Sequence, residues 1–212
     1  TKGVRATLGA RVTIPGSDNK YYKLNADVQG YYPLNRDHTW VISGKLGAGY
    51  ANGFGGKRLP FYQTYSAGGI GSLRGFAYGA IGPNAIYLRQ DSSGNPYWQP
   101  STDVIGGNAI ATVSAELIVP TPFVAEKNQN SVRTSLFVDA ASVWNTKWKE
   151  QDKALFPNLP DYSKASRVRA SAGVGFQWQS PIGPLVFSYA KPLKKYENDD
   201  VEQFQFSIGG SF

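Results

Sequence analysis

Few side chains in this sequence suit covalent catalysis or metal binding. The chain has one histidine, His38, and no cysteine, so thiolate nucleophiles and thiolate metal sites are excluded. His38 follows Arg36 and Asp37 in a stretch that we expect to be a short turn, whereas a Ser–His–Asp site needs its histidine beside a nucleophile. A single histidine is also a poor basis for a metal site. We therefore predict no catalytic residues, no metal and no cofactor, and we expect that the protein is not an enzyme.

A stronger candidate for a functional residue is Arg74, which lies in a glycine-rich stretch. The segment reads Gly71-Ser72-Leu73-Arg74-Gly75-Phe76 and is followed by Ile81-Gly82-Pro83. It belongs to a connection over 51–105, and loops longer than about 12–15 residues without their own structure are usually functional. An arginine fork can hold carboxylates with two parallel hydrogen bonds. Composition alone leaves open whether Arg74 is bound in this way or lies on an external surface.

The elements that would position Arg74 are β-strands. Apolar and polar residues alternate with a period of two, which predicts half-buried strands. The clearest case is 167–179, where Val168 and Ala170 share one face and Arg167 and Arg169 share the other. We predict eight such strands, over 3–14, 21–34, 39–50, 106–119, 131–143, 167–179, 184–191 and 202–212.

The two faces of these strands favour an antiparallel transmembrane β-barrel over a soluble sandwich, which would also alternate. The apolar faces carry no charge, and many of the strands exceed the usual length of about 5–6 residues. The opposite faces are rich in Arg, Lys, Gln, Ser and Gly, which suits a wet or loop-filled lumen. Aromatic residues lie near strand ends, as in an interfacial girdle; examples are Tyr22, Trp40, Tyr50 and Trp178. We expect lipid outside the barrel and water inside.

Connector lengths also alternate along the chain. One side of the barrel is expected to hold the links 35–38, 120–130 and 180–183. The other side is expected to hold the links 15–20, 51–105, 144–166 and 192–201, of which 51–105 is very long. Short periplasmic turns and long external loops produce this asymmetry. It places the last strand so that the chain ends in the periplasm. In that strand Phe204, Phe206, Ile208, Gly210 and Phe212 share the face that we expect to meet lipid.

A net charge of +7 raises the question of nucleic-acid binding. The sequence has no run rich in lysine or arginine, and its basic residues alternate with apolar ones along the predicted strands. We therefore expect no nucleic-acid partner. Alternation instead directs the basic residues inward, and it also directs inward Glu116 and Asp139 on the adjacent fourth and fifth strands. These two carboxylates are candidate partners for a lumenal arginine.

The stretch around Arg74 resembles the (V/I/L)RG(F/Y) motif on the sixth external loop of the BamA family of barrel-assembly factors. Leu73 stands where many members have valine. Likeness to this family extends from end to end of the chain and corresponds to the last eight strands of a sixteen-stranded barrel, without the first half and the periplasmic POTRA domains. Other stretches that carry it include 12–18, 106–109, 120–123, 131–135 and 183–190.

The resemblance implies roles for several residues. The loop carrying Leu73, Arg74, Gly75 and Phe76 would fold into the lumen, where Arg74 would meet Glu116 and Asp139. The last strand would form one edge of a seam that accepts client strands, with Gly209 and Gly210 loosening it. Its Phe204, Phe206, Ile208 and Phe212 resemble the terminal signal of such clients. The implied function is folding and insertion of β-barrel proteins into the bacterial outer membrane, with client proteins, lipid and accessory lipoproteins as partners, the lipoproteins acting through domains absent here.

Several alternatives stay open. A passive porin-like channel or a related protein-translocation pore would use the same alternation. The absence of methionine suggests a piece of a larger protein, in which 1–212 is one barrel unit with the long loop 51–105. Eight strands could close into a small barrel, which would expel the loop and break the Arg74 contacts. Alternatively, two copies could associate through their free strand edges and keep the loop inside.

Overall fold

The computed structural model describes residues 2–14, 16–122, 124, 131–148, 160–181 and 183–209. In these described residues, ten strands and one short 3-10 helix make up the regular structure. They are β1 (Gly3–Val12), β2 (Tyr21–Pro33), β3 (Val41–Gly53), η1 (Phe61–Gln63), β4 (Asn84–Gln90), β5 (Pro96–Val104), β6 (Ala109–Val119), β7 (Val132–Trp144), β8 (Arg169–Ser180), β9 (Gly183–Lys194) and β10 (Phe204–Ile208). No helix in the described residues is long and apolar enough to cross a membrane.

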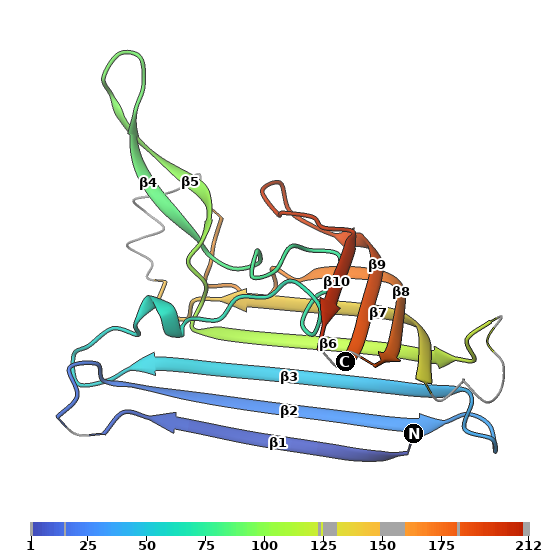
Figure 1. Ribbon diagram of the computed structural model, residues 1–212. Coiled ribbons are helices and arrows are strands. Elements are labelled where there is room, and N and C mark those ends of the chain that lie inside the picture. The colour runs from blue at the N-terminus through green and yellow to red at the C-terminus, as the bar shows by residue number, and fades with distance from the viewer. Residues whose placement is uncertain are drawn as a thin grey trace.

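Eight of the strands form one antiparallel sheet in the order β1-β2-β3-β6-β7-β8-β9-β10. This is the all-β meander that the sequence predicts, and each predicted strand is present. The sheet curls strongly, so that β8, β9 and β10 stand across the direction of β1, β2 and β3 (Figure 1). Among the described strands β1 and β10 pair with one neighbour each, so the sheet is open and the closed eight-stranded barrel is not the arrangement seen.

Strand ends differ from the prediction by a few residues for identifiable reasons. β3 continues to Gly53, beyond 50, because Ala51–Gly53 pair with the start of β2. β9 continues to Lys194, beyond 191, because a bulge at Ala170 and Ser171 of β8 lets the pairing resume. Gly210 and Phe212 of the predicted last strand lie outside the described residues.

Burial on the sheet is inverted relative to a water-soluble protein. Outward apolar side chains are exposed, with Leu8 at 82% and Val138 at 50%. On the opposite face Ser135 and Ser171 are buried, at 1% and 0%. Apolar residues outside and small polar residues inside are typical of a transmembrane β-barrel, and the predicted orientation of the two faces is confirmed.

The connection between β3 and β6 lies on the inner face of this sheet. It contains η1, the β4–β5 hairpin and three isolated bridges, Tyr65–Gly107, Ala67–Ile81 and Gly69–Leu73. The hairpin projects away from the sheet (Figure 1), and it is regular structure that the sequence prediction missed. The segment before the hairpin returns along the inner wall and carries Arg74 with it.

Candidate functional site

Arg74 binds two wall carboxylates, both of which alternation had directed inward. Its Nε lies 2.7 Å from Asp139 Oδ2 and its Nη2 lies 2.8 Å from Asp139 Oδ1, which is a bidentate pair. Its Nη1 lies 3.1 Å from Glu116 Oε1. All three residues are buried. Because β6 and β7 are adjacent, the two carboxylates flank one guanidinium, and the structure brings together the three residues that the sequence singled out.

The main chain of Arg74 is bound to the wall as well as its side chain. Its N–H donates to Asp139 Oδ2 at 3.2 Å, and its carbonyl accepts a hydrogen bond from Ser171 Oγ at 2.5 Å. Asp139 therefore accepts from both the backbone and the guanidinium of one residue. Residue 74 is fixed between β7 and β8, so its position on the wall does not depend on the side chain alone.

Hydroxyl groups and a second arginine complete the pairing of the carboxylates. Ser114 Oγ donates to Asp139 at 2.7 Å and Ser135 Oγ donates to Glu116 at 2.6 Å. Arg133 Nη2 lies 3.2 Å from Glu116 Oε2. A buried ion pair is stable only when the remaining lone pairs are also satisfied, and this network satisfies them. Glu116 thus has two cationic partners, whereas the cationic partner of Asp139 is Arg74.

The environment of Arg74 favours its charged form. The guanidinium carbon stacks 3.3 Å from the centre of the Phe137 ring, which is a cation–π arrangement. Burial by itself would lower the pKa of Arg74, but the hydrogen bonds and charges of Asp139 and Glu116 outweigh it and raise that pKa. Arg74 is therefore a permanent cation in this site.

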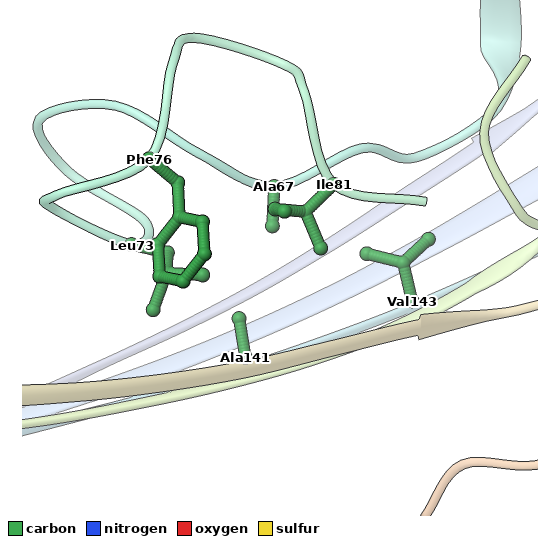
Figure 2. Close-up of a cluster of buried hydrophobic side chains, with 6 residues drawn as sticks. All are labelled: Ala67, Leu73, Phe76, Ile81, Ala141 and Val143. Carbon is green, nitrogen blue, oxygen red and sulfur yellow. The ribbon is translucent and has the colours of Figure 1, made fainter. Parts of the chain in front are cut away.

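Leu73 and Phe76 anchor the motif in an apolar cluster on either side of Arg74. The cluster comprises Ala67, Leu73, Phe76, Ile81, Ala141 and Val143. Figure 2 shows Leu73 and Phe76 side by side above Ala141 of β7, with Ile81 directed toward Val143. Both motif side chains are fully buried. Apolar side chains of the loop thus pack against apolar side chains of β7 beside the buried ion pairs.

Gly75 has a steric reason to be glycine. Its φ is +88°, and a Cβ built at this position would lie 2.9 Å from the Cβ of Ala190 on β9. A positive φ is costly for residues with a Cβ, and the close approach to β9 adds a second penalty. The motif therefore needs glycine after the arginine to pass this close to the wall.

The last strand and the segment before it bind the other side of the motif. Gln205 of β10 donates from Nε2 to the Phe76 carbonyl at 2.7 Å and accepts from the Gly75 N–H at 3.4 Å. Ala77 N–H donates to the Asp200 carbonyl, and Glu202 N–H donates to the Gly75 carbonyl. Sequence reasoning missed Gln205. Alternation directs it inward, but nothing in the sequence indicates which loop atoms it meets.

A second buried ion pair fixes the segment between β9 and β10. Arg169 on β8 holds Asp199 with Nε and Nη2, at 3.0 Å and 2.9 Å. The Tyr196 ring lies beneath this guanidinium at 4.6 Å and also contacts the guanidinium of Arg167 at 4.2 Å. Sequence reasoning directed Arg169 inward but did not identify Asp199, because a loop residue has no alternation to orient it.

Tyr65 attaches the start of the loop to β2. Its hydroxyl lies 2.7 Å from Asn25 Oδ1 and 3.0 Å from the Leu24 carbonyl, and the ammonium of Lys23 lies over its ring. Burial raises the pKa of Tyr65 to about 12, so the hydroxyl stays protonated and able to donate. The loop thus contacts the sheet from β2 to β10.

The remaining predicted residues lie apart from this site. His38 is exposed in the turn between β2 and β3, with a φ of 54°. Phe204, Phe206 and Ile208 of β10 point outward and are exposed, as predicted for a lipid-facing strand. Gly209 has a φ of +78°, and its N–H donates to the Pro184 carbonyl at 2.8 Å. Within the described residues, no group of three or more His, Cys, Asp or Glu side chains could hold a metal ion.

Comparison with protein families identifies the architecture. A sequence model described as the Omp85 superfamily domain matches residues 1–212. The chain belongs to the Omp85 superfamily. Within it, the chain is 35% identical to the outer membrane protein assembly factor BamA of Neisseria meningitidis serogroup B, over 100% of this chain and 26% of that protein. It is 27% identical to the sorting and assembly machinery component 50 homolog A of Xenopus laevis, over 93% of this chain and 38% of that protein.

A solved Omp85 structure supports the same arrangement. The crystal structure of BamA from Haemophilus ducreyi lacking POTRA domains 1-3 is similar to this chain with a TM-score of 0.89 and 61% sequence identity. The similarity covers 97% of this chain and 38% of that one. The chain thus spans well under half the length of these relatives, and the resemblance to the BamA family that the sequence indicated is confirmed.

Proposed function

We propose that this chain forms the C-terminal part of the barrel of a factor that folds and inserts β-barrel proteins into the bacterial outer membrane. The single observation that carries the proposal is the docking of the Leu73–Phe76 loop, through Arg74, onto Glu116 and Asp139 of an Omp85 barrel wall. For a passive pore we would expect a constriction loop rather than an arginine loop docked on wall carboxylates. A relative named as an outer membrane protein assembly factor is 35% identical to this chain over its full length.

The geometry of the last strand supports a role in strand exchange. β10 pairs with β9 over Phe204–Ile208, and its other edge faces no strand among the described residues. An unpaired edge can accept an extended client segment by β-augmentation, in which backbone hydrogen bonds supply affinity. We propose that this edge is one side of the seam through which clients enter the membrane.

The proposed activity involves no bond chemistry. Insertion is a conformational process, and the docked loop would act by keeping the wall beside the seam in shape. The proposed partners are lipid, nascent β-barrel clients and accessory lipoproteins bound through other parts of the whole protein. The sheet has an exposed apolar face, which includes Leu46, Val113 and Val174. We propose that this face contacts the acyl chains of the outer membrane.

Reconstitution of the whole protein in liposomes tests the proposal. Arg74→Ala should leave the barrel folded, with the mobility shift on heating that folded barrels give, while client insertion falls. Arg36→Ala is a matched control, because Arg36 is exposed in the turn between β2 and β3. An Arg74→Ala protein that inserts clients at the normal rate and supports growth in a complementation assay would contradict the proposal.

Single-channel recording separates the insertase from a passive porin-like channel or a translocation pore. The Leu73–Phe76 loop lies on the inner wall and is held by buried contacts, so the wild-type protein should show small and unsteady conductance. A large, steady conductance with no client insertion would support the pore instead.

A further inference from the structure

We propose that Gln205 is a latch that couples docking of the Leu73–Phe76 loop to the position of β10. Its side-chain amide joins the two directly, since it donates to the Phe76 carbonyl at 2.7 Å and accepts from the Gly75 N–H at 3.4 Å. Gln205 is 6% exposed, so water cannot readily replace either bond. Moving β10 away from the loop would remove the acceptor of the Gly75 N–H and leave the Phe76 carbonyl with the Gly69 N–H as its donor. A buried donor that loses its acceptor is costly.

The attachment of β10 to the rest of the sheet is short enough for these bonds to matter. Among the described residues β10 pairs with β9 at five positions, Phe204 to Ile208, whereas β7 and β8 pair at ten. The segment before β10 adds two backbone hydrogen bonds to the motif, and Val201 packs against the apolar cluster of the loop. The docked loop therefore adds to the hold that the sheet has on β10.

Ser188 provides an alternative partner for the latch. Within the described part of the chain its hydroxyl is buried without a hydrogen-bond partner, and Ser188 lies opposite Gln205 in the β9–β10 register. Residues directly opposite on one face of an antiparallel pair have Cβ atoms about 4.5–5.5 Å apart, within reach of an amide. When the loop moves away from β10, the Gln205 amide can turn and hydrogen-bond to the Ser188 hydroxyl. The amide then has a hydrogen-bond partner with the loop docked and with the loop released.

Coupling of this kind is reciprocal. If the latch acts, displacement of β10 at the seam loosens the loop, and release of the loop frees β10. This inference rests on the proposed function only where it links the coupling to the entry of a client strand. The coupling itself is a property of the chain and can be measured without any client.

Hydrogen exchange of the whole protein in nanodiscs tests the latch. Gln205→Ala should speed exchange of the amides over 73–77 by about five- to tenfold, the factor that a net hydrogen bond supplies. Gln205→Met, which keeps a side chain of similar length but has no amide, guards against a misfolded variant and should also speed it. A glutamate is unsuitable here because Gln205 Nε2 lies 3.3 Å from Glu202 Oε2. Gln203→Ala is the matched control, because the Gln203 side chain contacts the exposed Tyr189 hydroxyl and not the loop.

Substituting the loop and measuring hydrogen exchange in β10 distinguishes coupling from a merely structural role of Gln205. Arg74→Ala should speed exchange over 204–208, whereas Lys45→Ala, which removes a side-chain contact to the Gly71 carbonyl, should not. Ser188→Ala should slow exchange over 73–77, because the released amide loses its alternative partner. Unchanged exchange over 73–77 in both Gln205 variants would overturn the proposal, and unchanged exchange in Ser188→Ala would overturn the role of Ser188. Failure of the wild-type protein to insert clients would count against the proposed function alone.

Discussion

Arg74 and Asp139 are joined by three hydrogen bonds, one from the backbone N–H of the arginine and two from its guanidinium. This arrangement fixes both the position and the orientation of residue 74 on the wall. Glu116 contacts the same guanidinium once and is also paired with Arg133. The two carboxylates are therefore unequal partners, although the sequence presents them as a pair.

Removal of the two carboxylates should have unequal effects. Asp139→Ala should cost about 3–5 kcal/mol of loop docking, because it leaves a buried arginine without its bidentate partner. Glu116→Ala should cost less, since Arg133 is 27% exposed and can be solvated when Glu116 is gone. Hydrogen exchange over 73–77 measures the docking free energy, with Asp27→Ala, an exposed carboxylate of the same wall, as the control. Equal effects of the two substitutions would contradict this ranking.

Arg74→Lys should behave almost like Arg74→Ala. Lysine keeps the charge but presents a point ammonium instead of a planar fork, so it cannot bind Asp139 in two places and also reach Glu116. It also loses the stacking on Phe137. Client insertion in liposomes is the measurement, and insertion by Arg74→Lys at more than half the wild-type rate would show that charge alone suffices.

Gly75→Ala should undock the loop for two separable reasons. The positive φ at Gly75 strains any residue with a Cβ, and the added methyl group would press on Ala190. Gly71 has a φ of +101° but nothing within 4 Å of its built Cβ, so Gly71→Ala isolates the effect of φ. Combining Gly75→Ala with Ala190→Gly should restore part of the docking measured by exchange. No recovery in the double variant would mean that the contact with β9 is unimportant.

Phe76→Ala should destabilise the docked loop by about 3–5 kcal/mol, the usual cost of deleting a buried phenylalanine. Phe76 is 0% exposed within the apolar cluster of the loop, whereas Phe61 in η1 is 81% exposed. Phe61→Ala is therefore a control in the same loop and should have little effect. Limited proteolysis of the loop in nanodiscs distinguishes the two, and equal cleavage of both variants would argue against the cluster as an anchor.

Asp199→Asn should loosen the segment between β9 and β10. It removes the charge that Arg169 holds with Nε and Nη2 and leaves that buried guanidinium without a carboxylate partner. Asp200→Asn is the matched control, because Asp200 contacts the loop through its backbone carbonyl, which the substitution retains. Exchange of the Ala77 amide should rise in the first variant alone. A rise of the same size in both would assign the effect to local chain flexibility.

The sequence predicts the sheet well and the site only in part. Alternation is sufficient to find eight strands and to orient Glu116 and Asp139, because each strand residue has only two faces available. It does not orient loop residues, so Asp199 was not identified as the partner of Arg169, and the β4–β5 hairpin was hidden inside a long connection. Gln205 was oriented correctly, but its partners lie 129 and 130 positions away. The pattern within one strand carries no information over such distances.

The contacts that fix the motif are spaced along the chain in a consistent order. Arg74 meets Glu116 42 positions later, Asp139 65 positions later and Ser171 97 positions later, and Phe76 meets Gln205 after 129. During synthesis each partner emerges after the one before it, and the longest-range contacts are the slowest to form. The contacts that hold this loop are therefore complete only when β10 is in place. The full set of contacts on the Leu73–Phe76 loop can therefore form only after the chain from Arg74 to Gln205 has been made and folded.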